Sequence, residues 1–148
     1  MRMKNVVLFV SLVVAISLFR DAESKRFTLE EVRETLEPVK KICIERVGTD
    51  PKMIEDANKG KFVPDRKLQC YYKCLLVMTK SMSKDDQIQE EMFVKIVELM
   101  LDEKLVDPVM QAVIHCGPVA MQTMEGCQLA YEITKCLYEY DPTLMFFP

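Results

Sequence analysis

The stretch Cys70-Tyr71-Tyr72-Lys73-Cys74 restricts the fold of this sequence more than any other stretch. Its two cysteines are spaced so that they lie about one turn apart on the same face of a helix, and each is therefore expected to bond to a different neighbouring segment. The remaining cysteines extend the pattern to C-x26-C-x3-C-x41-C-x10-C-x8-C, and they are Cys43, Cys116, Cys127 and Cys136. An even cysteine count behind a secretory leader is typical of a disulfide framework, whose connectivity the spacing alone leaves open.

The first residues have the anatomy of such a leader. A basic start is followed by an apolar run of 14 residues from Val6 to Phe19, and the small residues Ala22 and Ser24 precede the expected cleavage site. The run is shorter than the roughly 18 residues that a membrane-spanning helix needs. We therefore expect a signal peptide at residues 1–24, a secreted domain at residues 25–148, and no membrane insertion.

The composition argues against several classes of function. Residues 25–148 hold 17 basic and 21 acidic residues, a net charge of −4, and no basic run is longer than Lys40-Lys41. A nucleic-acid partner is therefore not expected. One histidine and no CxxC pair argue against a metal site, and no cofactor is expected. The single histidine, His115, lies in no motif with a nucleophile, so we expect no catalytic residue and no enzymatic activity.

Apolar residues recur at helical spacing along the whole expected domain, whereas signals for strands are poor. The pattern predicts an all-α fold of about six helices. These cover approximately residues 28–47, 50–60, 65–82, 88–101, 107–116 and 125–138. Pro38 predicts a kink or break near Glu37 in the first helix, and Gly117-Pro118 predicts the end of the fifth.

The cysteine spacing, the stretch from Cys70 to Cys74 and the short tail after Cys136 together resemble the six-cysteine insect odorant-binding proteins of the pheromone and general odorant-binding type. The resemblance extends from Thr28 to Pro148. It implies helices around an internal apolar cavity, stapled by three interlocked disulfides. The implied pairs are Cys43–Cys74, Cys70–Cys127 and Cys116–Cys136. It also implies a carrier that moves odorants or pheromones through an aqueous extracellular fluid, which is sensillum-lymph-like if the role is olfactory.

The pocket candidates come from the central helix, the helices beside it and the tail. The tail ends in four consecutive large apolar residues, Leu144 to Phe147. We expect them to fold back and form part of the pocket wall, because exposed they would favour aggregation. The alternatives are a surface contact in a dimer and packing in the core away from the ligand. Abundant methionines are consistent with a tolerant pocket. The full set of candidates is Tyr72, Leu75, Leu76, Met92, Val97, Met100, Val113, Leu144, Met145, Phe146 and Phe147.

Two single residues are further candidates. Tyr72 is the preferred hydroxyl for selecting a polar ligand group, because it lies on the apolar side of the central helix. His115 is the candidate pH-sensitive residue, since histidine titrates near physiological pH.

Other partners and functions stay open at this point. A chemoreceptor and a second copy of the chain are candidate partners besides a small hydrophobic ligand. Two rival functions are a secreted helical signalling or protein-interaction ligand without a small-molecule pocket, and a non-olfactory scavenger of hydrophobic molecules.

Overall fold

The structure, a computed structural model, describes residues 25–148, and the expected signal peptide lies outside the described residues. Six α-helices and one short 3-10 helix account for most of this range, so the all-α class is confirmed. In chain order the elements are α2 (Leu29–Val47), α3 (Pro51–Ala57), α4 (Arg66–Met78), α5 (Glu90–Met100), α6 (Glu103–Ala120), α7 (Gly126–Tyr140) and η1 (Pro142–Leu144).

Acidic and hydroxyl side chains begin most of the helices. Thr28 and Glu31 form a reciprocal capping box at the start of α2, in which each side chain accepts a hydrogen bond from the other residue's backbone N–H. Asp50, Asp65 and Asp102 accept backbone hydrogen bonds at the starts of α3, α4 and α6. These local signals explain why the starts of the first three helices agree with the sequence pattern.

The break expected at Pro38 and both boundaries expected for the fifth helix are wrong. α2 continues past Pro38 without a break. α6 begins at Glu103 rather than at Asp107, and it continues through Gly117-Pro118 to Ala120. The reason is that Asp102 supplies an earlier cap, while the prolines lie at exposed positions where water can bond to the carbonyls that they leave free.

α4 also ends earlier than expected, at Met78, because Lys80 adopts a left-handed backbone conformation with φ 63°. The helix therefore stops before Met82.

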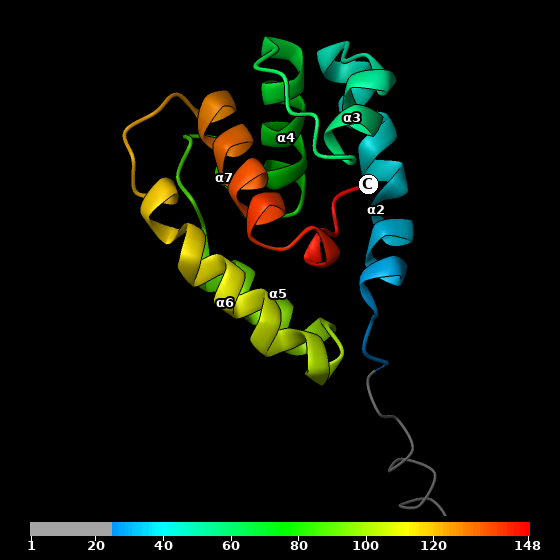
Figure 1. The fold of residues 1–148 in the computed structure, drawn as a ribbon, viewed down its shortest axis with the longest axis vertical. Helices are drawn as coiled ribbons and strands as arrows, with labels where there is room; N and C mark the ends of the chain where they lie inside the picture. The colour runs from blue at the N-terminus through cyan, green and yellow to red at the C-terminus, as the bar shows by residue number, and fades with distance from the viewer. Residues whose placement is uncertain (1–24) are drawn as a thin grey trace, which may run out of the picture.

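The three disulfides join the helices in the implied pairing, which is confirmed. Cys70–Cys127 links α4 to α7, and these two helices lie side by side at the centre (Figure 1). Cys43–Cys74 links α2 to α4, and Cys116–Cys136 links α6 to α7. The two cysteines of α4 thus bond to different helices, and α4 is tied to both of its large neighbours.

Buried apolar side chains form two clusters. The larger one surrounds α4 and includes Leu68, Tyr71 and Leu75, and the smaller one lies between α5 and α6 around Val97 and Val109. The C-terminal tail leaves α7 and crosses toward α2, so that it lies between the two clusters (Figure 1).

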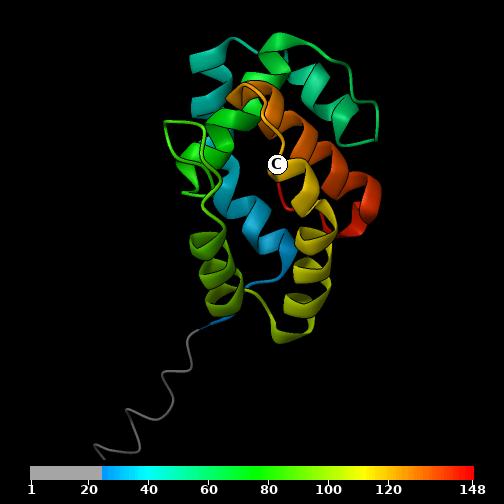
Figure 2. The same ribbon diagram turned by 90° about the vertical axis from the view of Figure 1, so that its left-hand side faces the viewer.

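The start of the described chain closes the far end of the smaller cluster. The Phe27 N–H donates to the Met100 carbonyl at 2.7 Å, and the Asp102 N–H donates to the Phe27 carbonyl at 3.0 Å. The Arg26 guanidinium donates to the carbonyls of Glu98 and Leu101, which are free at the C-terminal end of α5. In Figure 2 the start of α2 meets α5 and α6 at this end of the molecule.

Candidate functional site

A small apolar pocket lies where α5, α6 and α7 meet the tail. Its lining is entirely apolar and consists of Phe93, Val109, Ala112, Val113, Leu137, Leu144, Met145 and Phe146. The free space is only about 10 Å³, whereas an engineered apolar cavity that binds benzene has a volume of about 150 Å³. Tail side chains form part of the lining. The ring of Phe146 stacks on that of Phe93, with centroids 6.1 Å apart.

Polar contacts hold the tail in this position. The Asp141 carboxylate accepts hydrogen bonds from the backbone N–H and the hydroxyl of Thr143. These two bonds stabilise the turn that redirects the chain. The same bonds lower the pKa of the Asp141 carboxyl. Further along, Arg33 donates to the Met145 carbonyl, and the buried Tyr71 hydroxyl donates to the Pro148 carbonyl at 2.9 Å.

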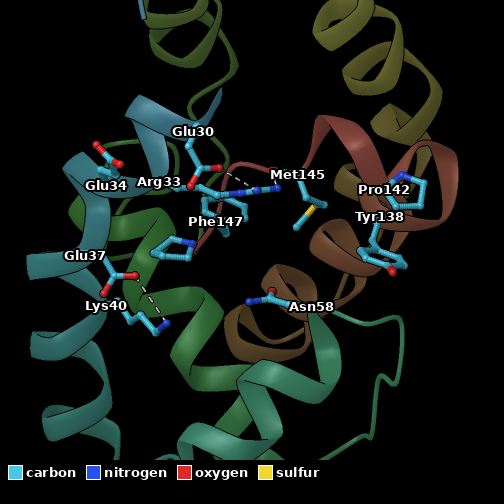
Figure 3. Close-up of a pocket in the computed structure, with 11 residues that line it drawn as sticks. Glu30, Arg33, Glu34, Glu37, Lys40, Asn58, Tyr138, Pro142, Met145 and Phe147 are labelled. Carbon is cyan, nitrogen blue, oxygen red and sulfur yellow. Dashed lines mark hydrogen bonds and ion pairs between the residues drawn. The ribbon is translucent and has the colours of Figure 1, made fainter. Parts of the chain in front are cut away.

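A second hollow, of about 310 Å³, opens to solvent on the other side of the tail, and we call it the open groove (Figure 3). Charged side chains of α2 line one wall, and Asn58 and Tyr138 face them across the hollow. Within that wall Arg33 pairs with Glu30 at 3.4 Å and Lys40 with Glu37 at 3.6 Å; the full charged set is Glu30, Arg33, Glu34, Glu37 and Lys40.

Met145 lines both the open groove and the apolar pocket. The tail is therefore a partition between an aqueous groove with a charged wall and an apolar interior.

Two observations concern other kinds of site. Among residues 25–148 no helix is long and apolar enough to cross a membrane. In the same range no three histidine, cysteine, aspartate or glutamate side chains gather in a way that suits a metal ion.

Comparison with known proteins agrees with this architecture. The profile of the PBP/GOBP family matches residues 25–140, which is most of the chain. The chain belongs to this insect family of odorant-binding proteins. Membership implies a non-enzymatic carrier of hydrophobic odorants.

Solved odorant-binding proteins share the fold. Odorant binding protein 5 of Apis mellifera superposes with a TM-score of 0.74 at 23% identity, over 84% of this chain and 100% of the other. Odorant Binding Protein 4 of Chrysopa pallens gives 0.74 at 24% identity, over 82% and 99%. A Locusta migratoria odorant-binding protein gives 0.63 at 23% identity, over 81% and 88%. The comparison with curated proteins finds no match.

In this odorant-binding protein the pocket candidates fall into three groups. The first group lines a hollow. The apolar pocket is lined by Val113, Leu144, Met145 and Phe146, and the open groove is lined by Phe147 beside Met145. A second group is buried in the core but lines neither hollow, and it consists of Tyr72, Leu75, Leu76 and Val97. Met92 and Met100 form the third group, because they are 47% and 41% exposed and lie outside both linings.

Four lining residues were missed by sequence reasoning, namely Phe93, Val109, Ala112 and Leu137. Val109, Ala112 and Val113 follow one another at helical spacing, so the face of α6 was visible in the pattern. For α5 the neighbouring Met92 and Phe93 are both large and apolar, and the sequence does not tell which one points inward.

His115 lies on the exposed surface of α6. Its ring packs against that of Tyr140, with centroids 4.8 Å apart, and it lines neither hollow. Its role as a pH-sensitive residue stays a prediction, which His115→Asn tests: loss of any pH dependence of ligand binding would support it, and an unchanged pH profile would contradict it.

Proposed function

We propose that this protein is a secreted carrier that binds small hydrophobic molecules, odorants or pheromones, in the pocket between α5, α6 and α7 after the tail has moved aside. One observation carries the proposal: a wholly apolar pocket is lined in part by the terminal side chains of the chain, Leu144, Met145 and Phe146, beside residues of α5, α6 and α7. The proposed guest contacts are Val113 and the helix residues around it, and the tail residues Leu144, Met145 and Phe146 are the group that the guest displaces.

The disulfides explain how the pocket would survive this exchange. Emptying a cavity of about 150 Å³ costs on the order of 4 kcal/mol when the walls do not collapse. Cross-links that close loops of 31, 57 and 20 residues each contribute about 3–4 kcal/mol in the chain-entropy account. They tie α2, α4, α6 and α7 together without using the tail, so these four helices can keep their places when the tail leaves.

Uptake of the fluorescent apolar probe N-phenylnaphthylamine by the oxidised protein tests the proposal. A blue-shifted, enhanced emission that saturates at low micromolar concentration is expected. A matched pair of variants locates the site: Val113 lines the pocket, whereas the next residue, Ile114, is 64% exposed. Val113→Asn should weaken binding and Ile114→Asn should not.

Failure of the oxidised protein to take up the probe would overturn the proposal and favour the rival signalling or protein-interaction function. A scavenging role outside the sensory system uses the same pocket, and the tissue of expression separates it from an olfactory one. We propose extracellular fluid as the location. A chemoreceptor and a second copy of the chain are proposed partners, and analytical ultracentrifugation tests the latter.

A further inference from the structure

Two adjacent tyrosines of α4 differ in how their buried hydroxyls are satisfied. Tyr71 is 0% exposed, and its hydroxyl donates to the Pro148 carbonyl at 2.9 Å. Tyr72 is 1% exposed, yet its hydroxyl has no hydrogen-bond partner among the described residues. A buried hydroxyl without a partner is costly, and it is rare in native proteins unless a ligand or water completes it.

Aromatic rings surround this hydroxyl-bearing side chain. The centroid of the Tyr72 ring lies 5.4 Å from that of Tyr71, 6.4 Å from that of Tyr131 and 6.5 Å from that of Phe62. Phe62 also packs edge-on against Tyr131 at 5.9 Å and Tyr138 at 5.4 Å. The surroundings are therefore suited to a flat apolar group.

Phe62 is the element of this cluster that can move most easily. It belongs to the segment without helix that joins α3 to α4 (Figure 1), and its neighbours Lys61 and Val63 are exposed while its own ring is half-buried. The backbone bonds of Gly60 and Lys61 return to the end of α3 and do not reach α4 or α7. Swinging the Phe62 ring outward thus costs the contacts of one side chain and leaves the helices in place.

The open groove borders two residues next to Phe62. Tyr138, which packs on Phe62, also lines the open groove, and Asn58 at the start of the same segment lines it too. A molecule held in the groove therefore lies next to the ring that closes the aromatic cluster.

We propose that Tyr72 is the hydrogen-bond donor of a ligand subsite beside Phe62, and that the subsite takes a ring-sized apolar molecule carrying one carbonyl oxygen, such as an aromatic ketone, aldehyde or ester. The proposal rests on the carrier function proposed above. The ligand ring replaces that of Phe62 against Tyr131 and Tyr138, and its carbonyl oxygen accepts from the Tyr72 hydroxyl.

The chemistry of the cluster selects a carbonyl. A carbonyl needs one donor and brings no proton that would itself need a partner. A carboxylate would bring a charge into an aromatic interior, which is far more costly. Burial raises the pKa of Tyr72, so its hydroxyl keeps the proton that it donates.

Acetophenone and isopropenylbenzene test the hydrogen bond, because they have nearly the same shape. Acetophenone has a carbonyl oxygen where isopropenylbenzene has a methylene group. The measurement is the ratio of their affinities, each determined directly by isothermal titration calorimetry. Tyr72→Phe should reduce the preference for acetophenone about fivefold. Tyr71→Phe, the matched control, should leave the ratio unchanged even if it alters both affinities. An equal ratio in wild type and Tyr72→Phe would overturn the proposal.

The movement of Phe62 has a separate readout. The sequence contains no tryptophan, so Phe62→Trp introduces a single tryptophan at the proposed subsite and Phe93→Trp introduces one in the apolar pocket. Acetophenone should shift the emission maximum of Phe62→Trp to the red. A shift in Phe93→Trp alone would place the ligand elsewhere and overturn the subsite.

These outcomes separate the two proposals. If N-phenylnaphthylamine binds but the acetophenone ratio does not depend on Tyr72, the carrier function stands and the subsite fails. If none of the three compounds binds, both fail.

Discussion

Deletion of residues 142–148 is the perturbation that bears most directly on the role of the tail. Met145 and Phe147 are almost fully buried in the larger cluster, and burying a side chain of this size contributes about 1.5–3 kcal/mol. Their loss, together with the hydrogen bond from Tyr71, should lower the free energy of unfolding by about 3–6 kcal/mol, and this is an upper range because unfolded chains are already partly compact.

The same deletion should strengthen ligand binding. A guest can enter the apolar pocket only in the fraction of molecules whose tail has left, and the apparent affinity is reduced by that fraction. If tail docking is worth about 1.5–3 kcal/mol at the pocket, removing the tail raises the affinity for N-phenylnaphthylamine roughly tenfold to a hundredfold.

The assays are urea unfolding of the oxidised protein and probe titration, with circular dichroism to confirm that the helices remain. Tyr71→Phe loosens the tail by one bond and should raise the affinity by a smaller factor, about fivefold. Unchanged or weaker probe binding by a folded deletion variant would show that the tail is a wall of the site and that the guest does not displace it.

Two further predictions concern stability. A Cβ at Gly126 would clash with a carboxylate oxygen of Asp86, so Gly126→Ala should lower the free energy of unfolding by about 1–3 kcal/mol in the same urea assay. Gly117 has open space around it, so Gly117→Ala should leave the free energy of unfolding unchanged or raise it by up to about 1 kcal/mol. The hydrogen bond from Arg66 lowers the pKa of the Glu125 carboxyl to about 2. The ionised Glu125 carboxylate therefore stabilises the folded protein above pH 4.5, and this stabilisation is lost as the pH falls from 4.5 toward 2. Since the pair is exposed, the loss should be below about 1 kcal/mol, and a Glu125→Gln variant with the same acid dependence as wild type would contradict it.

Local signals made much of the fold predictable. The capping box of Thr28 and Glu31 and the caps Asp50 and Asp65 act within one helical turn, and the sequence therefore locates those helix starts. Asp102 and Asp107 are both plausible caps for α6, and the choice between them depends on the contact of Asp102 with Phe27, which is distant in sequence. The disulfide pairing came from the family resemblance, since the spacing alone left it open.

The site was less predictable for the same physical reason. The bonds of the tail to Arg33 and Tyr71 join residues separated by 112 and 77 positions. No local pattern encodes them. The choice between Met92 and Phe93 depends on the rotation of α5, which packing against α6 sets. The missing partner of the Tyr72 hydroxyl likewise became visible only once its neighbours were placed.

The central claim is that a hydrophobic guest takes the place of the tail between α5, α6 and α7. A crystal structure of the oxidised protein with N-phenylnaphthylamine tests it most directly. We expect probe density against Phe93, Val109 and Val113, with Leu144 to Phe146 moved out of the pocket. Probe density only at the protein surface, with Phe146 still stacked on Phe93, would contradict it.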